Sequence, residues 1–445
     1  MLILILTGFI LLRLLPNLIY QVPTGYDAGI YLYLFKIFPQ IPQWQKLGFS
    51  PGLFYLTWPL VKLGISPESI LVPMQILSGI FLFGCLYFVV KKLIDKKTAL
   101  LAVFLLTISA VQFRAFWYFY VKNVFALGLM ILSLYFLSQK KLIKCLSFVL
   151  LTAIFHLATF LMLVLTIVIS GVFTKDKGFY LKILVGGLLL GGLAYLTNWQ
   201  LAIKPFLQPM LTMNKNNSGS FYSLGVSFLL TVLYLPLSIY GLSFVGKNKS
   251  NLKPFFTGTI VILAWVTLRL FFYNRFFITL DILLIFWAAI GLNKLMEKYK
   301  QYKDWWQFYL GILAVFIIGF VCKTGQPLIA KQVLNEIKHL EVEPNATILS
   351  TGKGDAAWLM GYTNQPVIAW KYGGEDQYWT HEQWQLALSQ TEINEKNELF
   401  KLLPQPMYLF INDINLARWL ELQQPPCFEP KSLHFYKFVC QESTD

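Results

Sequence analysis

The chain has 445 residues, of which 56% are hydrophobic, 17% aromatic and only 13% charged. A soluble protein of this length needs far more charged surface, so a soluble globular fold is excluded. The net charge of +15 does not indicate a nucleic-acid partner, because the basic residues form short clusters between apolar blocks and no nucleic-acid-binding motif is present. The composition therefore predicts a polytopic membrane protein.

Apolar blocks long enough to cross a ~30 Å hydrocarbon layer as helices follow one another along the chain. Residues 2–20 form the first block, and because no small-residue cleavage site follows it, we interpret it as an uncleaved span. Later spans are expected at residues 68–90, 98–113, 124–138, 181–197, 224–245, 255–272, 276–295 and 307–322. The positive-inside rule places the lysine clusters between them in the cytoplasm. These clusters lie at residues 91–97, 140–144, 175–177, 247–253 and 298–303.

Residues 145–173 lie between two of these cytoplasmic clusters and must therefore leave the cytoplasm and return. As one helix this segment would measure about 43 Å, which is short of the roughly 60 Å that two full crossings need. We predict a pair of short helices that meet inside the membrane near residues 155–159. The alternative is one long span and a misplaced cytoplasmic cluster.

This topology leaves residues 21–67, residues 198–223 and the chain from residue 323 onward outside the cell. The first of these segments has aromatic stretches broken by prolines, which favour short helices in the membrane interface. Residues 323–445 are more polar and alternate strand-like with helix-like runs. Strands are expected at 345–351, 366–370, 407–411 and 433–439, and helices at 355–362 and 382–390.

The predicted fold is thus an α-helical polytopic membrane protein, with about eleven transmembrane helices in residues 1–322 and a small extracytoplasmic α/β domain in residues 323–445. Cys427 and Cys440 have a hairpin-like separation in that domain. In an oxidising compartment a disulfide between them would add roughly 3 kcal/mol of stability. The turn from Gly352 to Asp355 lacks phosphate-loop spacing and is interpreted as a plain strand-to-helix turn. No cysteine and histidine cluster has metal-site spacing.

Ionisable residues in or beside the spans are the candidates for function, because a charge in hydrocarbon is costly. The topology places one acid and several cations toward the outer side of the membrane. Asp27 is the sole acid in residues 1–67. The other members of the set are Arg13, Arg114, Lys122, His156, Arg269 and Arg275. This grouping predicts an anionic ligand handled near the outer surface, with one carboxylate available as a base.

Each member also has a structural interpretation. Asp27 is equally well placed to cap the helix that follows it, and the arginines could be anchors that extend to the membrane surface. His156 could be a hydrogen-bonded core residue. Glu68 is interpreted as a helix N-terminus, and Asp281 is expected to pair with an arginine or with a neighbouring helix.

Several short motifs resemble the GT-C superfamily of membrane glycosyltransferases, in the branch of protein O-mannosyltransferases and the lipid A aminoarabinose transferase. They are Asp27 after the first span, the aromatic-proline stretch 49–56, His156 with Thr159, the Arg-aromatic segment 273–277, and residues 361–368 of the tail. The resemblance covers the whole length in architecture. Many members carry a second acid in or near the first external loop, whereas here Glu68 alone is available. The sequence therefore leaves open whether the reaction depends on a divalent metal.

The resemblance implies an inverting glycosyltransferase of the cell membrane. It would move a sugar from a polyprenyl-phosphate donor to a glycan, lipid or protein acceptor on the outer face, with the C-terminal domain outside and no nucleic acid involved. Asp27 would be the base, and the substrate-binding residues would be Arg275, His156, Arg114, Arg13 and Tyr26. Two other classes stay open, a transporter or flippase for an anionic lipid or solute and a scaffold protein. We see no internal repeat of spans, which many transporters have.

Overall fold

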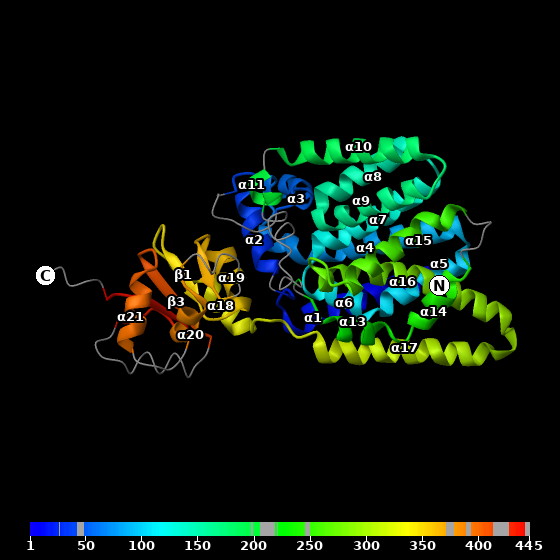
Figure 1. Ribbon diagram of the computed structural model, residues 1–445. Coiled ribbons are helices and arrows are strands. Elements are labelled where there is room, and N and C mark those ends of the chain that lie inside the picture. Colours follow the sequence, from blue (N-terminus) through cyan, green and yellow to red (C-terminus); the bar gives the residue numbers. More distant parts are fainter. Residues whose placement is uncertain are drawn as a thin grey trace. The chain divides into compact units, whose positions relative to one another are not determined.

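The structure is a computed structural model (Figure 1), and it describes residues 1–25, 27–41, 49–196, 199–204, 219, 221–244, 250–370, 378–388, 393–412 and 427–440. The chain divides into two compact units. The first comprises Met1–Ile19, Gly48–Pro59 and Val72–Gln326. The second comprises Tyr20–Leu47, Leu60–Leu71 and Pro327–Asp445. The unit that contains the C-terminal residues therefore also includes part of the expected first external loop.

Helices are present at every predicted span, and further helices lie in the predicted external segments 21–67 and 198–223. They are α1 Leu2–Tyr20, α3 Gly52–Lys62, α4 Pro67–Leu93, α5 Lys96–Ile108, α6 Ala110–Trp117, α7 Val121–Ser138, α8 Leu142–Phe155, α9 Leu157–Val172, α10 Lys177–Ala194, α11 Trp199–Ala202, α13 Leu224–Thr231, α14 Leu235–Leu242, α15 Lys253–Thr267, α16 Tyr273–Lys298 and α17 Lys303–Thr324, with 3₁₀ turns at Ser250–Leu252 and Lys300–Tyr302. Within the described residues, six helices are long and apolar enough to cross a membrane, or up to eight if the bent pairs α5–α6 and α13–α14 each form one span. The helical membrane class is confirmed, and the count of eleven crossings stays a prediction.

The segment 145–173 forms two short apolar helices, as predicted. Helix α8 ends at Phe155 and α9 begins at Leu157. His156 between them has an extended backbone, with φ −158° and ψ 107°. Its side chain accepts a hydrogen bond from the backbone N–H of Thr159 and so caps the start of α9. The break is therefore specified by a polar residue within an otherwise apolar stretch.

Helix α16 lies in the core of the first unit and is buried along most of its length. It passes very close to α14, because both helices have glycine where they meet. A Cβ atom at Gly241 would lie 2.0 Å from the carbonyl oxygen of Trp287, and one at Gly291 would lie 2.1 Å from that of Leu237. Any larger residue would force the two helix backbones apart, which is the usual role of small residues between membrane helices.

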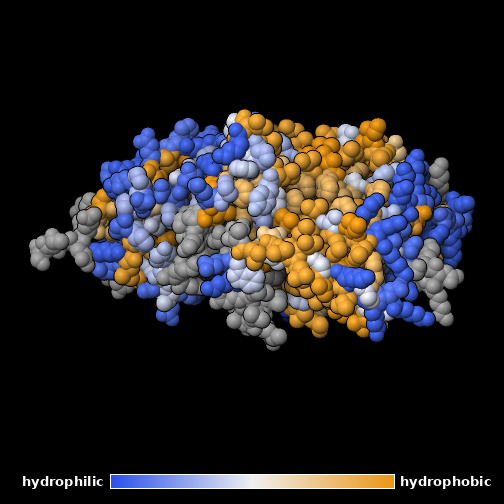
Figure 2. All heavy atoms as spheres, turned by 90° about the horizontal axis from the view of Figure 1, so that it is seen from above, coloured by the Kyte–Doolittle hydropathy of each residue, from blue (hydrophilic) through white to orange (hydrophobic). Residues whose placement is uncertain are grey.

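Large apolar side chains cover the outside of the helical unit. Helices α10 and α17 expose many of them, including Leu188, Leu189, Leu193, Phe308 and Val315. Figure 2 shows the resulting broad hydrophobic surface in orange. Patches of this extent are not stable in water, so the surface is that of a protein embedded in lipid.

The second unit contains helix α2 (Asp27–Ile37) and the C-terminal α/β fold. The fold has strands β1 Thr347–Ser350, β2 Val367–Ala369, β3 Met407–Phe410, β4 Phe428–Pro430 and β5 Phe435–Phe438, and helices α18 Lys331–Lys338, α19 Lys353–Thr363, α20 His381–Leu388 and α21 Ile393–Lys401. The strand order is β2-β1-β3-β5-β4. Strand β1 is parallel to β2 and β3, with Ile348 opposite Val367 and Tyr408, whereas β5 is antiparallel to β3 and β4. The predicted α/β class is confirmed, but β4, α18 and α21 were not anticipated.

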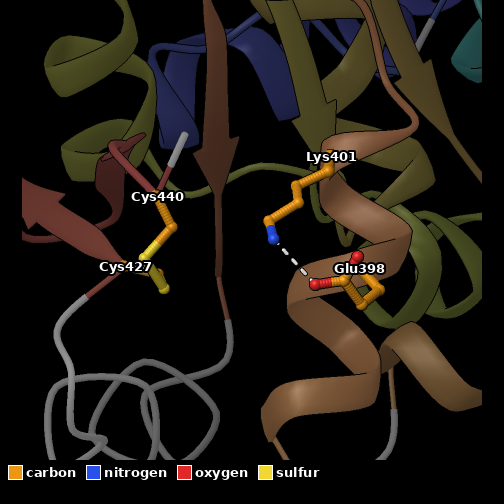
Figure 3. Close-up of a disulfide and its surroundings, with 4 residues drawn as sticks. All are labelled: Glu398, Lys401, Cys427 and Cys440. Carbon is orange, nitrogen blue, oxygen red and sulfur yellow. Dashed lines mark hydrogen bonds and ion pairs between the residues drawn. A yellow bond between two sulfur atoms is a disulfide. The ribbon is translucent and has the colours of Figure 1, made fainter. Parts of the chain in front are cut away.

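A disulfide joins Cys427 and Cys440, with a Cα–Cα distance of 4.7 Å (Figure 3). The two residues lie just before β4 and just after β5, so the bond ties the ends of the antiparallel pair together. In the same view Lys401 and Glu398 of α21 form an ion pair of 2.7 Å. The pairing that the sequence left conditional on an oxidising compartment is therefore present.

The Gly352–Asp355 segment is a strand-to-helix turn, as predicted. Gly352 is the N-cap of α19 directly after β1. Asp355 is 3% exposed, and its carboxylate accepts a hydrogen bond of 3.4 Å from the amide of Asn412. The turn thus contributes to the domain core.

Candidate functional site

A small cavity of about 10 Å³, with room for about one water molecule, lies inside the first unit between α7, α9 and α16. Two aromatic side chains and several polar ones line it. The described lining residues are Asn123, His156, Ala158, Thr159, Phe272, Arg275, Phe276 and Thr279. The cavity therefore brings together His156 and Arg275, two residues predicted to bind substrate from distant parts of the sequence.

A chain of hydrogen bonds fixes the His156 ring. Its Nδ1 atom lies 3.2 Å from the backbone N–H of Thr159 and 2.8 Å from the Thr159 hydroxyl oxygen. That hydroxyl in turn donates to the side-chain oxygen of Asn123 at 3.2 Å. Because Nδ1 accepts the backbone N–H, the neutral ring has its proton on Nε2. Among the described residues Nε2 has no hydrogen-bond partner, so this N–H remains available to a ligand.

Two helix N-termini meet at the cavity. Helix α9 begins after His156, and α16 begins after Phe272, whose left-handed φ of 55° turns the chain sharply into the helix. Among the described residues no side chain caps α16. The positive ends of both helix dipoles therefore favour an anion in this place.

Arg275 supplies a full positive charge in the first turn of α16. Its guanidinium carbon lies 4.3 Å from the centre of the Tyr120 ring. Arg275 and Lys122 are the charged groups whose fields act on His156. The cavity is thus lined by hydrogen-bond donors under a positive potential, which favours an anionic group.

The family model that matches this chain, described as the EpsG family, covers residues 2–330. The chain belongs to the EpsG family. A search of curated proteins finds no significant match.

Solved structures with a similar fold are GT-C enzymes. ArnT from Cupriavidus metallidurans, bound to undecaprenyl phosphate, has a TM-score of 0.66 and 12% identity, over 98% of this chain and 97% of ArnT. The oligosaccharyltransferase AglB from Archaeoglobus fulgidus, in complex with an inhibitory peptide and a dolichol-phosphate, has a TM-score of 0.59 and 12% identity, over 92% of this chain and 69% of AglB. The predicted resemblance to GT-C membrane glycosyltransferases is confirmed at the level of the fold.

Asp27, the predicted base of this EpsG-family chain, is the first residue of α2 and is half-buried. An acid in the first turn is favoured by the helix dipole, so the capping and the functional interpretations are compatible. Asp27 belongs to the second unit, whereas the cavity belongs to the first. Tyr26 lies outside the described residues. The functional assignment of both residues stays a prediction.

Arg13 and Arg114 are not among the described residues that line the cavity. Arg13 is 2% exposed and donates to the carbonyl oxygens of Phe9 and Leu106, at 3.4 and 3.3 Å. It is therefore a buried crosslink between α1 and α5 rather than an anchor at the membrane surface. The Arg114 guanidinium stacks on Trp117 at 3.5 Å and donates to the carbonyl oxygen of Thr324 at 3.2 Å. Their assignment to the substrate also stays a prediction.

Asp281 of the EpsG-family chain is paired with neighbouring helices, one of the two expected arrangements. Its carboxylate accepts hydrogen bonds from the Tyr234 hydroxyl, from Ser109 at 2.9 Å and from Gln112 at 2.9 Å. Ser109 lies at the 55° bend between α5 and α6, and Tyr234 precedes α14 at the 78° bend after α13. The network therefore ties two bent helix pairs to α16.

The described residues contain no group of three or more His, Cys, Asp or Glu side chains that could hold a metal ion. Glu68, the second acid near the first external loop, lies in the first turn of α4, as predicted. It pairs with Lys338 at 2.5 Å. A divalent metal therefore has no evident ligand set in the part of the chain that the structure describes.

Proposed function

We propose that this EpsG-family chain is an inverting glycosyltransferase that moves a sugar from a polyprenyl-phosphate-linked donor to a hydroxyl-bearing acceptor. The observation that carries this proposal is the small polar cavity, where two helix N-termini, Arg275 and the His156 ring lie together and favour an anionic oxygen such as that of a phosphate. ArnT and AglB, which have a similar fold, were solved with undecaprenyl phosphate and dolichol-phosphate, and both ligands belong to the proposed class.

The reaction is a single displacement at the anomeric carbon. The acceptor hydroxyl oxygen forms a bond to this carbon while the bond to the donor phosphate oxygen breaks, so the configuration inverts. The hydroxyl proton passes to the Asp27 carboxylate, and the electron pair of the broken bond stays on the lipid phosphate. The phosphate gains negative charge as it leaves, and it therefore needs cationic groups and hydrogen-bond donors that are already in place.

We assign the donor phosphate to Arg275 and to the Nε2–H group of His156. Both surround the same cavity, and Thr159 with Asn123 fixes the orientation of the imidazole. A ring held in this way loses little entropy when it binds a ligand. Arg114, Arg13 and Tyr26 are kept as further substrate-binding residues on the basis of the family resemblance.

The acceptor that we favour is a growing glycan. The EpsG family is a family of GT-C-like polymerases, and a polymerase adds units to a growing chain. A lipid or protein acceptor would react in the same way, and the panel of acceptors described below distinguishes these possibilities.

We place the second unit on the extracytoplasmic side of the cell membrane. The Cys427–Cys440 disulfide supports this placement, because such bonds persist in oxidising compartments and are rare in the cytosol. Residues 323–445 are accordingly proposed as the extracytoplasmic domain, and residues 1–322 as the membrane domain.

The test uses the full chain in lipid nanodiscs with undecaprenyl-phosphate-linked radiolabelled sugars and a panel of acceptors. Asp27→Asn should lower the transfer rate by about 10²–10⁴-fold, the usual contribution of a general base, and leave undecaprenyl phosphate binding unchanged. Arg275→Gln should weaken that binding about tenfold, since a phosphate contact of this kind contributes about 1–2 kcal/mol.

Asp176→Asn is the matched control, because it makes the same change at an exposed carboxylate that pairs with Lys140 on the surface. It should leave both quantities unaltered. Transfer by Asp27→Asn at the normal rate would rule out this base, and full binding by Arg275→Gln would rule out the cavity as the phosphate site.

A transporter or flippase is the second candidate. It is favoured by the acid buried between two bent helix pairs, because discontinuous helices surround the ion sites of many transporters. In sealed vesicles, movement of undecaprenyl phosphate across the bilayer without a glycosylated product would support transport over transfer.

A further inference from the structure

Helix α2 is docked on helix α19 of the C-terminal fold at a very close crossing within the second unit. A Cβ atom at Gly29 would lie 2.4 Å from both the carbonyl carbon and the carbonyl oxygen of Ala357, and 2.6 Å from the nitrogen of Trp358. These are backbone atoms in a helix and cannot turn aside as a side-chain end could. A residue with a side chain at position 29 would therefore push the two helices apart.

The opposite helix contributes a second glycine to this crossing. A Cβ atom at Gly361 would lie 2.7 Å from the carbonyl oxygen of Gly29 and 3.2 Å from Cδ2 of Leu32. Neither glycine has a left-handed backbone, so what both positions require is space rather than conformational freedom. The pair thus forms a small-residue contact like those that allow close packing of membrane helices.

A partly buried hydrogen bond fixes the position of α2 along α19. The Lys36 ammonium in the last turn of α2 donates to the carbonyl oxygen of Gly361 at 2.6 Å. Carbonyl groups in the last turn of a helix have no partner within the helix, and α19 ends at Thr363. The same ammonium lies 5.4 Å from the centre of the Tyr362 ring. The contacts of Lys36 with Gly361 and Tyr362 thus set the register of α2 on α19.

We propose that Gly29, Gly361 and Lys36 are positioning residues, through which the C-terminal domain holds helix α2 and thereby the base Asp27. The inference rests on the proposed function, because it assumes that Asp27 accepts the proton. It assigns the C-terminal domain a part in the reaction, since the domain carries the acid even though the acid is encoded more than three hundred residues earlier. Loosening the crossing should therefore impair the chemical step more than donor binding.

The decisive variant is Gly361→Ala, compared with Gly354→Ala on the same helix. Both replace a glycine inside α19, two helical turns apart, so they change helix propensity alike. A Cβ atom at Gly354 meets nothing closer than 3.7 Å, an ordinary contact. In the nanodisc assay Gly361→Ala should lower kcat at least tenfold and change KM for the radiolabelled undecaprenyl-phosphate sugar less than threefold. Gly354→Ala should match the wild type.

Two further readouts separate positioning from general damage. Hydrogen exchange of the α2 amides should become at least tenfold faster in Gly361→Ala and stay unchanged in Gly354→Ala. In an Asp27→Asn background Gly361→Ala should reduce the residual rate no further, because a displaced base matters only while the base is present. If Gly361→Ala fails to fold, Lys36→Met replaces it, since this change removes the hydrogen bond without adding a clash.

Fast exchange in α2 with an unchanged kcat would overturn the inference and leave Asp27 as the base. An unchanged exchange rate would overturn the role of Gly361 in docking, and a further loss in the Asp27→Asn background would show general damage. Failure of the proposed function itself is distinct, because Asp27→Asn alone would then retain the normal rate.

Discussion

Replacing Asp281 tests whether the buried acid of the membrane unit is structural or functional. Asp281 is fully buried in α16 and accepts hydrogen bonds from Tyr234, Ser109 and Gln112. In Asp281→Leu these donors lose their acceptor in the buried interior of the first unit. We expect a large loss of stability and, in the molecules that remain folded, a normal rate of transfer.

The expected loss of stability follows from the number of donors that are left without an acceptor. An unsatisfied buried donor costs about 1–3 kcal/mol. Gln112 also donates to the carbonyl oxygen of Ile278 at 2.9 Å, so its amide keeps one partner. The Ser109 and Tyr234 hydroxyls lie 3.4 Å apart, so either one can donate to the other. About two donors remain without an acceptor, and Asp281→Leu should cost about 2–6 kcal/mol. Asp281→Asn keeps one acceptor oxygen and should cost about 1–2 kcal/mol.

The free energy of unfolding of the full chain can be measured by titrating detergent micelles with dodecyl sulfate. A double variant supplies the matched control. Tyr234→Phe added to Asp281→Leu removes one stranded donor and should recover about 1–3 kcal/mol. Wild-type stability for Asp281→Leu, or no recovery in the double variant, would refute the hydrogen-bond account. Loss of lipid movement in folded Asp281→Asn would instead favour the transporter.

The C-terminal domain carries two further predictions. Replacing Cys427 and Cys440 with serine opens a loop with a sequence separation of 13 residues and should lower the stability of the domain by about 3 kcal/mol. The measurement is hydrogen exchange of the β4 and β5 amides. Unchanged exchange would show that the hairpin does not depend on the bond. Burial raises the pKa of Asp355 from 3.8 to about 6. Because the folded-state pKa lies above the unfolded one, this stabilisation is complete below about pH 4 and is lost as the pH rises through about 6. Asp355→Asn should remove that slope and gain up to about 3 kcal/mol at pH 8, whereas an unfolding curve with the wild-type pH dependence would assign the slope to another group.

The positions of the membrane helices could be predicted from the sequence, because a lipid environment requires long apolar segments and few other patterns produce them. Their internal shape could not. Residues 98–113 were expected as one span, but Ser109 ends α5 and caps α6 by accepting the backbone N–H of Gln112. A serine within an apolar stretch is also common in straight membrane helices, where it bonds the carbonyl of the preceding turn. Whether it bends the chain depends on partners such as Asp281, which lie far away in the sequence.

Only part of the candidate site could be predicted from the sequence. His156 and Arg275 were identified from their residue types and their places in the spans, and Thr159 from the family resemblance. The structure places these three residues on one cavity, whereas Arg13 and Arg114 are not among its described lining residues. Asn123, which fixes Thr159, gave no signal, because a single asparagine near a helix start has many other uses. The docking of Asp27 through Gly29 and Gly361 was equally hidden. A glycine reveals a close approach only when its partner is known, and these partners lie at opposite ends of the chain.

The breaks in the apolar helices distinguish structural polar groups from functional ones. Every break inside a membrane exposes backbone groups that must find partners, so a polar residue at a break is not by itself evidence of function. At the α5–α6 and α13–α14 bends the polar groups satisfy one another through Asp281. At the α8–α9 break His156 uses only Nδ1 for the backbone, and its Nε2 has no partner among the described residues. His156 is only partly buried, and its Nε2–H group lies beside Arg275, so this donor is open to a ligand that completes the set.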